Sequence, residues 1–419
     1  MKKRNPIEDL AHLRHEFGEH GGVNMSIEAS TTFTVMAPET MPEMFAGRKG
    51  PDKGCYLYGR HFNPTVYNLG RQLAAMEGTE AAYCTASGMA AISGAVLGVC
   101  GTGDEIVASN AIYGGTYAFL RDFLPAKCDI RTTFVDITNL DAVADAITDK
   151  TRLVLTESVS NPTLRLANMP RLADIAHRRG VRLMVDNTFS PLILRPAGLG
   201  ADIVVHSITK FISGASDVIA GAVCGTEEFI GELMDLHTGP LMLLGPTMDP
   251  HIAADLSLRV PHLPLRMAEH GKRALELASR LTALGLQIGY PGLAEHPDHD
   301  LFNELRTSEY GYGGVFTIDV GDAETANELM SRLQNEQRFG YLAVSLGYFD
   351  TLMSCSGSST SSEMSDEDQQ AAGISPGLVR VSIGYTGTLE QRWSQLLAAL
   401  EDTGIVVATP RDESDIRTA

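Results

Sequence analysis

Apolar residues follow two different spacings between about residues 65 and 225. Segment 67–78 carries apolar residues three or four positions apart, as in an amphipathic helix, and a second helix begins at 87–99. Short runs rich in apolar and β-branched residues predict seven strands, at 81–85, 104–109, 130–136, 152–158, 181–186, 202–207 and 218–225. Helical and strand patterns that alternate in this way indicate an α/β fold whose strands form one large, mostly parallel sheet.

The pattern changes beyond about residue 257. A long helical run at 266–285 is followed by further elements, predicted as a strand at 313–320, a helix at 323–334, a strand at 378–384 and a last helix. Thr388 and Gln391 form a capping box at the start of that last helix. Trp393 lies on its apolar stripe, where core packing is the expected role. These elements predict a second, smaller domain of the α+β class.

Residues 1–64 lack the apolar residues of a self-sufficient core and are rich in Gly, Pro and polar residues around 48–64. Such an arm must lie against another surface, and a neighbouring subunit is the expected one. The Ser-rich and then acidic stretch 353–373 and the tail from 409 are expected to be loops or partly ordered. We therefore predict an arm at 1–64, a large domain at 65–256 and a small domain at 257–419.

Composition limits the classes of function. Of the 419 residues, 44% are hydrophobic, which is enough to bury a sizeable core. The 52 acidic and 33 basic residues give a net charge of −19, and no Lys- or Arg-rich patch interrupts this balance. Nucleic acid and anionic membranes are therefore not expected partners, whereas small metabolites and proteins remain.

The cysteines and histidines do not indicate a metal site. Six cysteines are widely scattered without a CxxC pair, which favours reduced thiols in a cytoplasmic protein. No signal peptide or membrane-spanning run is visible. His296 and His299 have a spacing that metal ligands can show, but they lie in a Pro-containing loop without further ligands, so we expect solvated surface residues there.

Two charged side chains follow buried strands of the predicted sheet. Asp186 ends the strand 181–186, and Lys210 comes shortly after the strand 202–207. Both are expected to face one crevice, because open α/β sheets bind ligands at the carboxyl ends of their strands. Taken singly, Asp186 is as readily a loop cap and Lys210 as readily a solvated lysine. A desolvated lysine, however, has a lowered pKa and becomes the nucleophile that Schiff-base chemistry needs.

Hydroxyl and backbone groups nearby are suited to a phosphate. Ser87, Gly88 and Met89 lie between a strand and the start of a helix, where free N–H groups and the helix dipole favour an anion. A glycine at such a turn is often needed for steric reasons only, so this segment alone is weak evidence. Ser207 and Thr209 add two hydroxyls beside Lys210.

These groups together favour one cofactor, pyridoxal phosphate. That cofactor needs a lysine for its aldehyde, a carboxylate for its ring nitrogen, donors for its phosphate and a flat residue against its ring. Lys210, Asp186 and the hydroxyl-rich segments supply the first three, and Tyr113 supplies the flat residue. A dehydrogenase is excluded because no GxGxxG follows the first strand.

The chain resembles the Cys/Met-metabolism family of fold-type I pyridoxal phosphate enzymes over nearly its whole length. The motifs that carry the resemblance are "YLYGRHFNPT", "TASGMAAIS", "IYGGTYAF", "SVSNPTLR", "VDNTFSP", "ADIVVHSITKFISG", "AVSLG" and "GISPGLVRVSIG". Within the family the chain is most similar to plant-type methionine γ-lyases, through "LMLLGPTM", "YGYGG" and "SIGYTGTLEQ". The resemblance implies a cytoplasmic homotetramer built as a dimer of dimers, acting on a sulfur amino acid.

The resemblance also implies roles for residues around the cofactor. Lys210 would bind the aldehyde, Asp186 would pair with the ring nitrogen, and Tyr113 would stack on the ring and act as an acid. Donors to the phosphate would be Ser87, Gly88, Met89, Ser207 and Thr209, together with Tyr58 and Arg60 of the neighbouring subunit.

Three further residues are implied to contact the substrate. Asn161 would touch the cofactor or the substrate, while Ser345 and Arg380 would hold the substrate carboxylate. Arginine suits this role because its planar guanidinium binds a carboxylate through two hydrogen bonds. Taken singly, Arg380 is as readily part of a surface salt bridge.

The implied reaction is elimination at the γ-carbon of L-methionine, which gives methanethiol, ammonia and 2-oxobutanoate. Two positions differ from the bacterial methionine γ-lyases: Gly115 stands where they carry a Cys, and Met234 replaces a Lys just before the matching acid, Asp235. The residues do not rank methionine, homocysteine, cystathionine and O-acetylhomoserine as substrates. Cystathionine γ-lyase and the γ-replacement enzymes, O-acetylhomoserine sulfhydrylase and cystathionine γ-synthase, remain alternatives, as does a cofactor-binding sensor without turnover.

Overall fold

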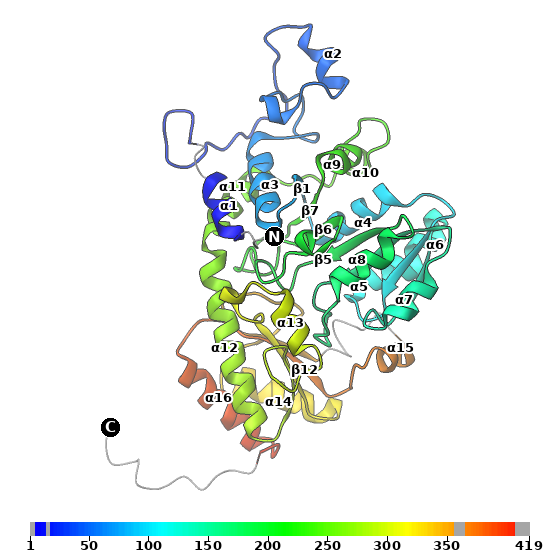
Figure 1. The fold of residues 1–419 in the computed structure, drawn as a ribbon. Coiled ribbons are helices and arrows are strands. Elements are labelled where there is room, and N and C mark those ends of the chain that lie inside the picture. Colours follow the sequence, from blue (N-terminus) through cyan, green and yellow to red (C-terminus); the bar gives the residue numbers. More distant parts are fainter. Residues whose placement is uncertain (1–4, 14–16, 356–364, 407–419) are drawn as a thin grey trace.

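The large sheet has seven strands in the order β1-β7-β6-β5-β4-β2-β3 (Figure 1). A computed structural model describes residues 5–13, 17–355 and 365–406 of the chain. The strands are β1 (Ala81–Thr85), β2 (Glu105–Ser109), β3 (Arg131–Val135), β4 (Thr151–Glu157), β5 (Arg182–Asp186), β6 (Ile203–Ser207) and β7 (Gly221–Gly225). Strand β7 is antiparallel to both neighbours, and the other adjacent pairs are parallel. The predicted α/β fold with a mostly parallel sheet is confirmed.

Helices cover both faces of this sheet, and each face has its own apolar core. One face is covered by α3 (Pro64–Glu77), α7 (Leu140–Ala146), α8 (Met169–His177) and α11 (Pro250–Arg259). The other face is covered by α4 (Gly88–Val99), α5 (Gly114–Ala118), α6 (Leu124–Cys128), α9 (Glu227–Leu233) and α10 (Pro240–Leu244). Because the inner strands such as β4 and β6 are buried on both faces, their sequences are nearly continuous apolar runs rather than alternating patterns.

Side-chain caps fix the starts of α3 and α4, which lie on opposite faces of the large sheet. Asn63 caps α3 by accepting hydrogen bonds from the N–H groups of Thr65 and Val66, at 2.9 and 3.2 Å. Helix α3 ends at Gly78, whose φ of 78° is a left-handed conformation that favours glycine. Ser87 caps α4 by accepting from the N–H of Ala90 at 3.1 Å. The apolar helix α4 is thereby held with its first turn at the carboxyl edge of the sheet.

A second sheet of five strands has the order β10-β11-β12-β9-β8. Its strands are β8 (Gln287–Gly289), β9 (Val315–Asp319), β10 (Tyr341–Leu342), β11 (Leu352–Cys355) and β12 (Leu378–Ser382). The helices that accompany it are α12 (Leu263–Ala283), α13 (His299–Leu305), α14 (Ala323–Asn335) and α16 (Leu389–Asp402). The long helix α12 joins the two sheets, because Leu263 and Met267 are buried in the core of the large sheet whereas Ala274 and Leu277 are buried in that of the small one. The domain boundary near 257 stays a prediction.

The last helix begins as the sequence predicts. Thr388 accepts a hydrogen bond from the N–H of Gln391 at 3.1 Å, which is one half of the predicted capping box. Trp393 is half-buried against the small core, and the guanidinium of Arg280 lies 5.5 Å from its ring centroid. Packing, partly through a cation–π contact, is therefore its role.

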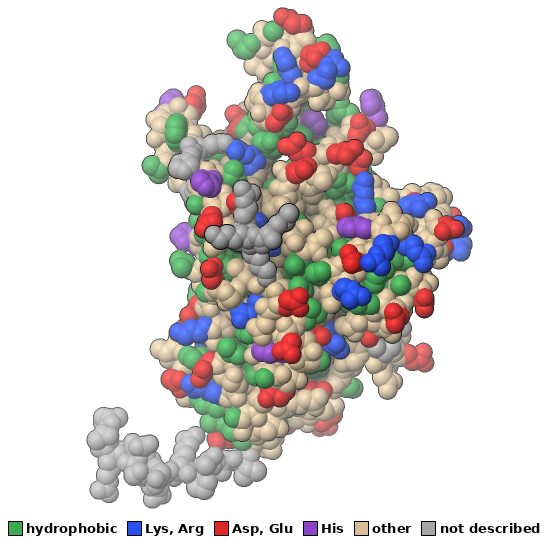
Figure 2. Space-filling model, in the orientation of Figure 1, with side chains coloured by type: hydrophobic (Ala, Val, Ile, Leu, Met, Phe, Trp, Pro, Cys, Tyr) green, Lys and Arg blue, Asp and Glu red, His purple; other side chains and the backbone are tan. Residues whose placement is uncertain are grey.

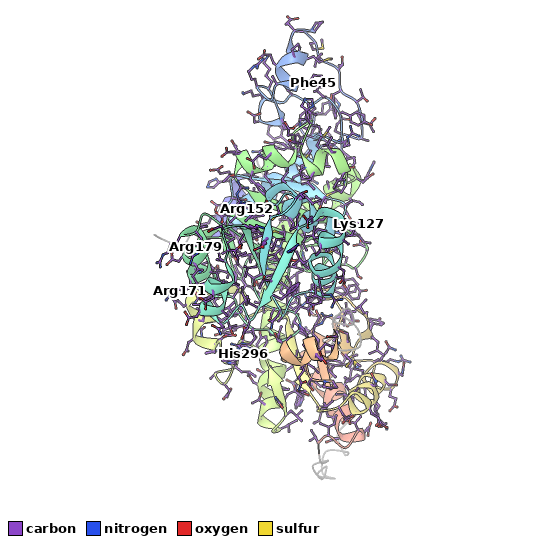
Figure 3. The ribbon with its side chains drawn as sticks, turned by 90° about the vertical axis from the view of Figure 1, so that its right-hand side faces the viewer. Phe45, Lys127, Arg152, Arg171, Arg179 and His296 are labelled. Carbon is purple, nitrogen blue, oxygen red and sulfur yellow. The ribbon has the colours of Figure 1, made fainter. Side chains whose placement is uncertain are left out.

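The N-terminal arm is only partly attached to its own chain. Helix α1 (Pro6–Leu13) packs on the large core through Leu10, while the segment around α2 (Thr40–Phe45) projects away from the body (Figure 1). Hydrophobic side chains lie on the surface of this projecting part (Figure 2). Val23 and Met36 are 87% and 95% exposed, and Phe45 near the tip is 58% exposed (Figure 3). An apolar surface of this kind indicates a contact with another chain.

The acidic stretch contains more regular structure than the sequence indicates. Met353–Cys355 belongs to β11, and 366–371 form the short helix α15 (Asp366–Ala371), where loops were expected. Residues 356–364 and the tail from 409 lie outside the described residues. Helix α11 is a further element that the sequence pattern did not predict. No helix in the described ranges combines the length and the apolar character that crossing a membrane requires.

Candidate active site

Lys210 lies just beyond the end of β6 and points toward the small sheet. Its Nζ donates a hydrogen bond to Ser345 Oγ at 3.0 Å, across 135 positions of sequence. Burial, together with the nearby Arg380 cation, lowers the pKa of Lys210 to about 8. Much more of this amine is therefore unprotonated near neutral pH than in an ordinary lysine, as a nucleophile requires.

Arg380 in β12 is a buried cation whose contacts are with neutral oxygens. Its side chain is 2% exposed, and it donates to Asn161 Oδ1 at 2.9 Å and to the Ser345 carbonyl at 3.0 Å. Among the described residues no carboxylate forms a direct ion pair with it. Burial lowers the pKa of Arg380 to about 10, opposed by the nearby Glu157 carboxylate. A buried guanidinium without a direct ion-pair partner is costly, so this arrangement suits an anionic ligand that completes the pair. The surface salt bridge considered for Arg380 is excluded by its burial.

Asp186 ends β5 and keeps one carboxylate oxygen available. Its Oδ1 accepts from the backbone N–H and the hydroxyl of Thr188, at 2.9 and 2.5 Å, while its Oδ2 has no partner among the described residues. Burial raises the pKa of Asp186, opposed by the two Thr188 hydrogen bonds. A cationic ligand at Oδ2 would remove that burial penalty. Thr188, which positions the carboxylate, was missed from the sequence.

A second carboxylate, Glu157, ends β4 beside Asp186. The two residues are register partners in adjacent strands. Burial and then repulsion from Asp186 raise the pKa of Glu157 to about 8. Its two oxygens accept from the backbone N–H groups of Tyr113, at 3.0 Å, and Asn161, at 2.8 Å. Glu157 therefore holds two predicted site segments together. It was missed from the sequence, although its place at the end of an apolar strand is the signal that identified Asp186.

The predicted phosphate donors meet where α4 begins. A Cβ atom on Gly88 would lie 2.7 Å from the Cβ of Ser207, so only glycine permits this approach. The first turn of α4, which includes Met89, therefore faces Ser207. The Thr209 hydroxyl already has hydrogen-bond partners in its own chain. It donates to Ala220 O at 3.2 Å and accepts from the Ala220 N–H at 2.9 Å. A further role of Thr209 toward phosphate stays a prediction.

The remaining predicted residues have exposed side chains. Tyr113 precedes α5, and its side chain is 42% exposed at the crevice. Tyr58 and Arg60 lie on the arm, with the Arg60 guanidinium 5.6 Å from the Tyr58 ring centroid. Neither makes a hydrogen bond or ion pair with Lys210, Asp186 or Arg380. Their predicted action on a neighbouring subunit is not tested by a single chain.

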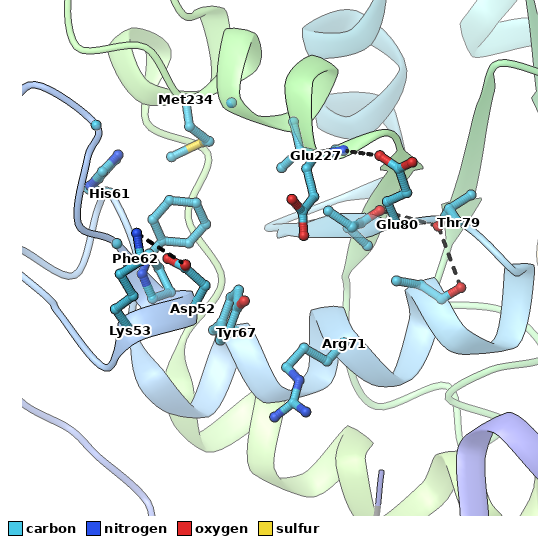
Figure 4. A pocket seen from close by; sticks show the side chains of 18 of the residues that line it. Asp52, Lys53, His61, Phe62, Tyr67, Arg71, Thr79, Glu80, Glu227 and Met234 are labelled. Atoms are coloured by element: carbon cyan, nitrogen blue, oxygen red, sulfur yellow. Dashed lines mark hydrogen bonds and ion pairs between the residues drawn. The ribbon is translucent and has the colours of Figure 1, made fainter. Parts of the chain in front are cut away.

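A separate cavity lies at the base of the arm (Figure 4). Its volume is about 810 Å³, and its wall includes His61, Phe62, Arg71 and Met234. None of the residues around Lys210 lines it. Met234, one of the two departures noted in the sequence, is buried there at 2% exposure, and its carbonyl accepts a hydrogen bond from His61. We place the chemistry at Lys210, because that site combines a desolvated amine, a carboxylate and a helix turn that is suited to an anion.

The residues around Lys210 fit pyridoxal phosphate. The amine can bind an aldehyde, Asp186 Oδ2 can pair with a ring cation, and the first turn of α4 against Ser207 can hold a phosphate. A comparison with known protein families agrees, because residues 10–399 match the model of the Cys/Met metabolism PLP-dependent enzymes. This chain belongs to that family.

Individual members of the family are similar over nearly the whole chain. The methionine gamma-lyase of Arabidopsis thaliana is 59% identical over 392 residues, which cover 93% of this chain and 89% of the relative. The L-methionine gamma-lyase of Porphyromonas gingivalis is 37% identical over 85% of this chain and 88% of its own length. The family membership establishes a PLP-dependent enzyme.

Solved structures support the same fold and cofactor. Cystathionine gamma synthase from Xanthomonas oryzae has a TM-score of 0.85 and 31% identity, covering 96% of this chain and all of that one. A putative O-acetylhomoserine (thiol)-lyase from Campylobacter jejuni has a TM-score of 0.86 and 26% identity, with 95% of this chain and 100% of that chain covered. That structure carries a pyridoxyl-lysine monophosphate. The predicted fold type and cofactor are therefore confirmed for this chain.

Proposed function

We propose that this chain is an L-methionine γ-lyase. It would convert L-methionine and water into methanethiol, ammonia and 2-oxobutanoate. The 59% identity with the Arabidopsis methionine gamma-lyase over 93% of the chain supports the substrate. The observation in the structure that carries the proposal is Arg380, a buried cation that forms no direct ion pair with any described carboxylate and is joined to Lys210 through Ser345.

Each side chain of the site would have its own role in such a reaction. Arg380 binds the α-carboxylate of the amino acid, and Asn161 fixes the guanidinium that does so. The cofactor, when bound, supplies the electron sink that makes the Cα proton acidic. Lys210 Nζ removes that proton and later moves protons at Cβ, which its lowered pKa permits. Tyr113 Oη is the acid that protonates the departing sulfur.

Substitution at the γ-carbon is the second candidate, because two of the similar solved structures are a cystathionine gamma synthase and a putative O-acetylhomoserine (thiol)-lyase. Elimination and replacement begin with the same loss of the γ-substituent, and they differ in whether a thiol adds afterwards. The arrangement of Arg380 and Lys210 serves either outcome. Cystathionine γ-lyase activity is the third member of this group.

One assay separates these candidates. The purified holoenzyme is given methionine, homocysteine, cystathionine or O-acetylhomoserine, each with and without an added thiol, and 2-oxobutanoate and ammonia are measured. We expect the highest kcat/KM for keto-acid release with methionine and little effect of the thiol. A new thioether formed faster than keto acid would instead identify a γ-replacement enzyme. Absence of turnover with all four would identify a cofactor-binding sensor.

We also propose a cytoplasmic homotetramer in which Tyr58 and Arg60 reach the phosphate of a neighbouring subunit. The exposed apolar side chains of the arm support an interface. The six cysteines are free thiols, which supports a reducing compartment. Light scattering of the purified holoenzyme tests the oligomer.

A further inference from the structure

A buried glutamate–histidine pair in hydrogen-bond contact lies on the face of the large sheet opposite Asp186. His206 Nε2 is 2.7 Å from Glu77 Oε1, and the two side chains are 0% and 1% exposed. Successive residues of a strand point to opposite faces, so His206 in β6 points away from Ser207 and toward α3. The reaction as described above uses neither residue.

Glu77 is an unfavourable residue at this position. It is the last residue of α3, where the helix dipole disfavours a negative charge. Glu77 Oε2 and His206 Nδ1 are buried and have no hydrogen-bond partner among the described residues. Replacing a buried ion pair by apolar residues often leaves stability unchanged or improves it. Stability alone therefore does not explain the pair.

The same oxygen of Glu77 also contacts the end of β5. Asn187, which follows Asp186 directly, donates its Nδ2 hydrogen to Glu77 Oε1 at 3.0 Å. The Asn187 backbone N–H donates to the carbonyl of Val205 at 2.9 Å, beside His206. One carboxylate oxygen thus joins the end of the strand that carries Asp186 to the end of the strand that leads to Lys210.

We propose that Glu77 is a positioning residue for the cofactor site. From beneath the sheet it sets the separation between Asp186, which would pair with the ring nitrogen, and Lys210, which would bind the aldehyde. Ligands that bridge two strand ends depend on that separation, because a shift of about 1 Å weakens such a site severely. The inference concerns the cofactor and does not rest on the proposed substrate, since its test needs no turnover.

The test measures cofactor affinity and geometry in purified protein. Cofactor is removed and titrated back, and the Kd and the visible circular dichroism of the bound cofactor are recorded. Glu77→Met removes both contacts of Oε1, and we expect at least a tenfold rise in Kd, the equivalent of about 1.4 kcal/mol, with a weakened dichroism band. Glu77→Gln keeps an acceptor oxygen for Asn187, so its Kd should stay within about threefold of the parent.

A matched control separates positioning from packing. Cys224 is fully buried in β7, and burial and then the nearby Glu77 carboxylate raise the pKa of its thiol well above the usual range. Cys224→Ala removes a packed side chain near Glu77, and this side chain makes no hydrogen bond to β5 or β6. The Kd and the dichroism of this variant should therefore equal those of the parent, even if its Tm falls. Parental Kd and dichroism in Glu77→Met would overturn the proposal. If that variant does not fold, Asn187→Leu decides: a fivefold rise in Kd, about 1 kcal/mol, supports the proposal and an unchanged Kd refutes it.

Discussion

Burial changes the chemistry of Lys210 more than any neighbouring charge does. Desolvation is the largest cause of its lowered pKa, and the Arg380 cation adds to it. The same low-dielectric environment strengthens the attraction between Arg380 and a substrate carboxylate. One crevice therefore makes an amine reactive and prepares a binding site for an anion.

The lowered pKa of Lys210 predicts a shifted pH dependence of its reactivity. An amine reacts only when it has lost its proton, so the cofactor-free protein should show reactivity rising with pH through about 8 instead of about 10.5. Competitive labelling with a trace of acetic anhydride, followed by peptide mass analysis, measures this midpoint. The exposed Lys127 in the same sample serves as the internal comparison (Figure 3). A Lys210 midpoint above about 9.5 would contradict the burial argument.

Gly115 gives a second prediction at this scale. A Cβ atom there would lie 2.6 Å from Tyr113 Cε1 and 3.2 Å from Tyr113 Oη. Gly115→Ala should therefore displace the Tyr113 ring and lower kcat/KM by about tenfold, although alanine favours the helix. The control is Gly231→Ala, where the added Cβ meets no atom within 4 Å. Steady-state kinetics and Tm are compared for both. If Gly115→Ala has the same kcat/KM as the control, the position of the Tyr113 ring does not depend on the absence of a side chain at Gly115.

Some site residues could be predicted from the sequence, and others could not, for a physical reason. Lys210 and Asp186 were found because each is a charged residue directly after an apolar strand, which is a local signal. Glu77 and His206 make their contact across 129 positions of sequence, and nothing local distinguishes a buried glutamate at a helix end from an exposed one. Long-range pairs of this kind require the fold.

At the scale of elements, strands of the large sheet were predictable because burial on both faces makes their sequences continuously apolar. Helix α15 was not, because its Ser-rich and acidic surroundings lack an apolar stripe. The close approach of β7 to the turn before α4 could not be predicted from the sequence either. A Cβ atom on Gly221 would lie 2.2 Å from the carbonyl oxygen of Ser87, and backbone cannot yield as a flexible side chain does.

This approach predicts a strong effect of one methyl group. Gly221→Ala should push the first turn of α4 away from Ser207. If that turn supplies the phosphate donors, as proposed, the Kd of pyridoxal phosphate should rise by about 100-fold. Titration of the cofactor-free protein by absorbance measures the Kd. Gly101→Ala is the control, because its Cβ would meet only Asp104 Oδ2, at an ordinary 3.7 Å. If the Kd of pyridoxal phosphate for Gly221→Ala is within about threefold of that of the control, the first turn of α4 can shift to accommodate the methyl group.

At the scale of the whole molecule, contacts within a single chain do not explain the exposed apolar surface of the arm. Its apolar side chains are exposed, and it holds Tyr58 and Arg60 outside the contacts of Lys210. The sequence predicted an arm from its lack of a core, whereas no sequence pattern shows which surface covers it. Mixed subunits can decide whether the arm completes a neighbouring site.

A Lys210→Ala subunit keeps an intact Arg60, and an Arg60→Ala subunit keeps an intact Lys210. If Arg60 acts across an interface, a pair with one subunit of each kind contains one complete site, although each variant alone has none. Equal amounts of the two variants are refolded together, and random pairing then predicts recovery of about a quarter of the parental activity. The control mixes Lys210→Ala with Asp186→Ala, in which every site of the mixed pair lacks one of the two residues. That pair should remain inactive, because Lys210 and Asp186 must come from one chain. Recovery in neither mixture would place Arg60 in the site of its own subunit.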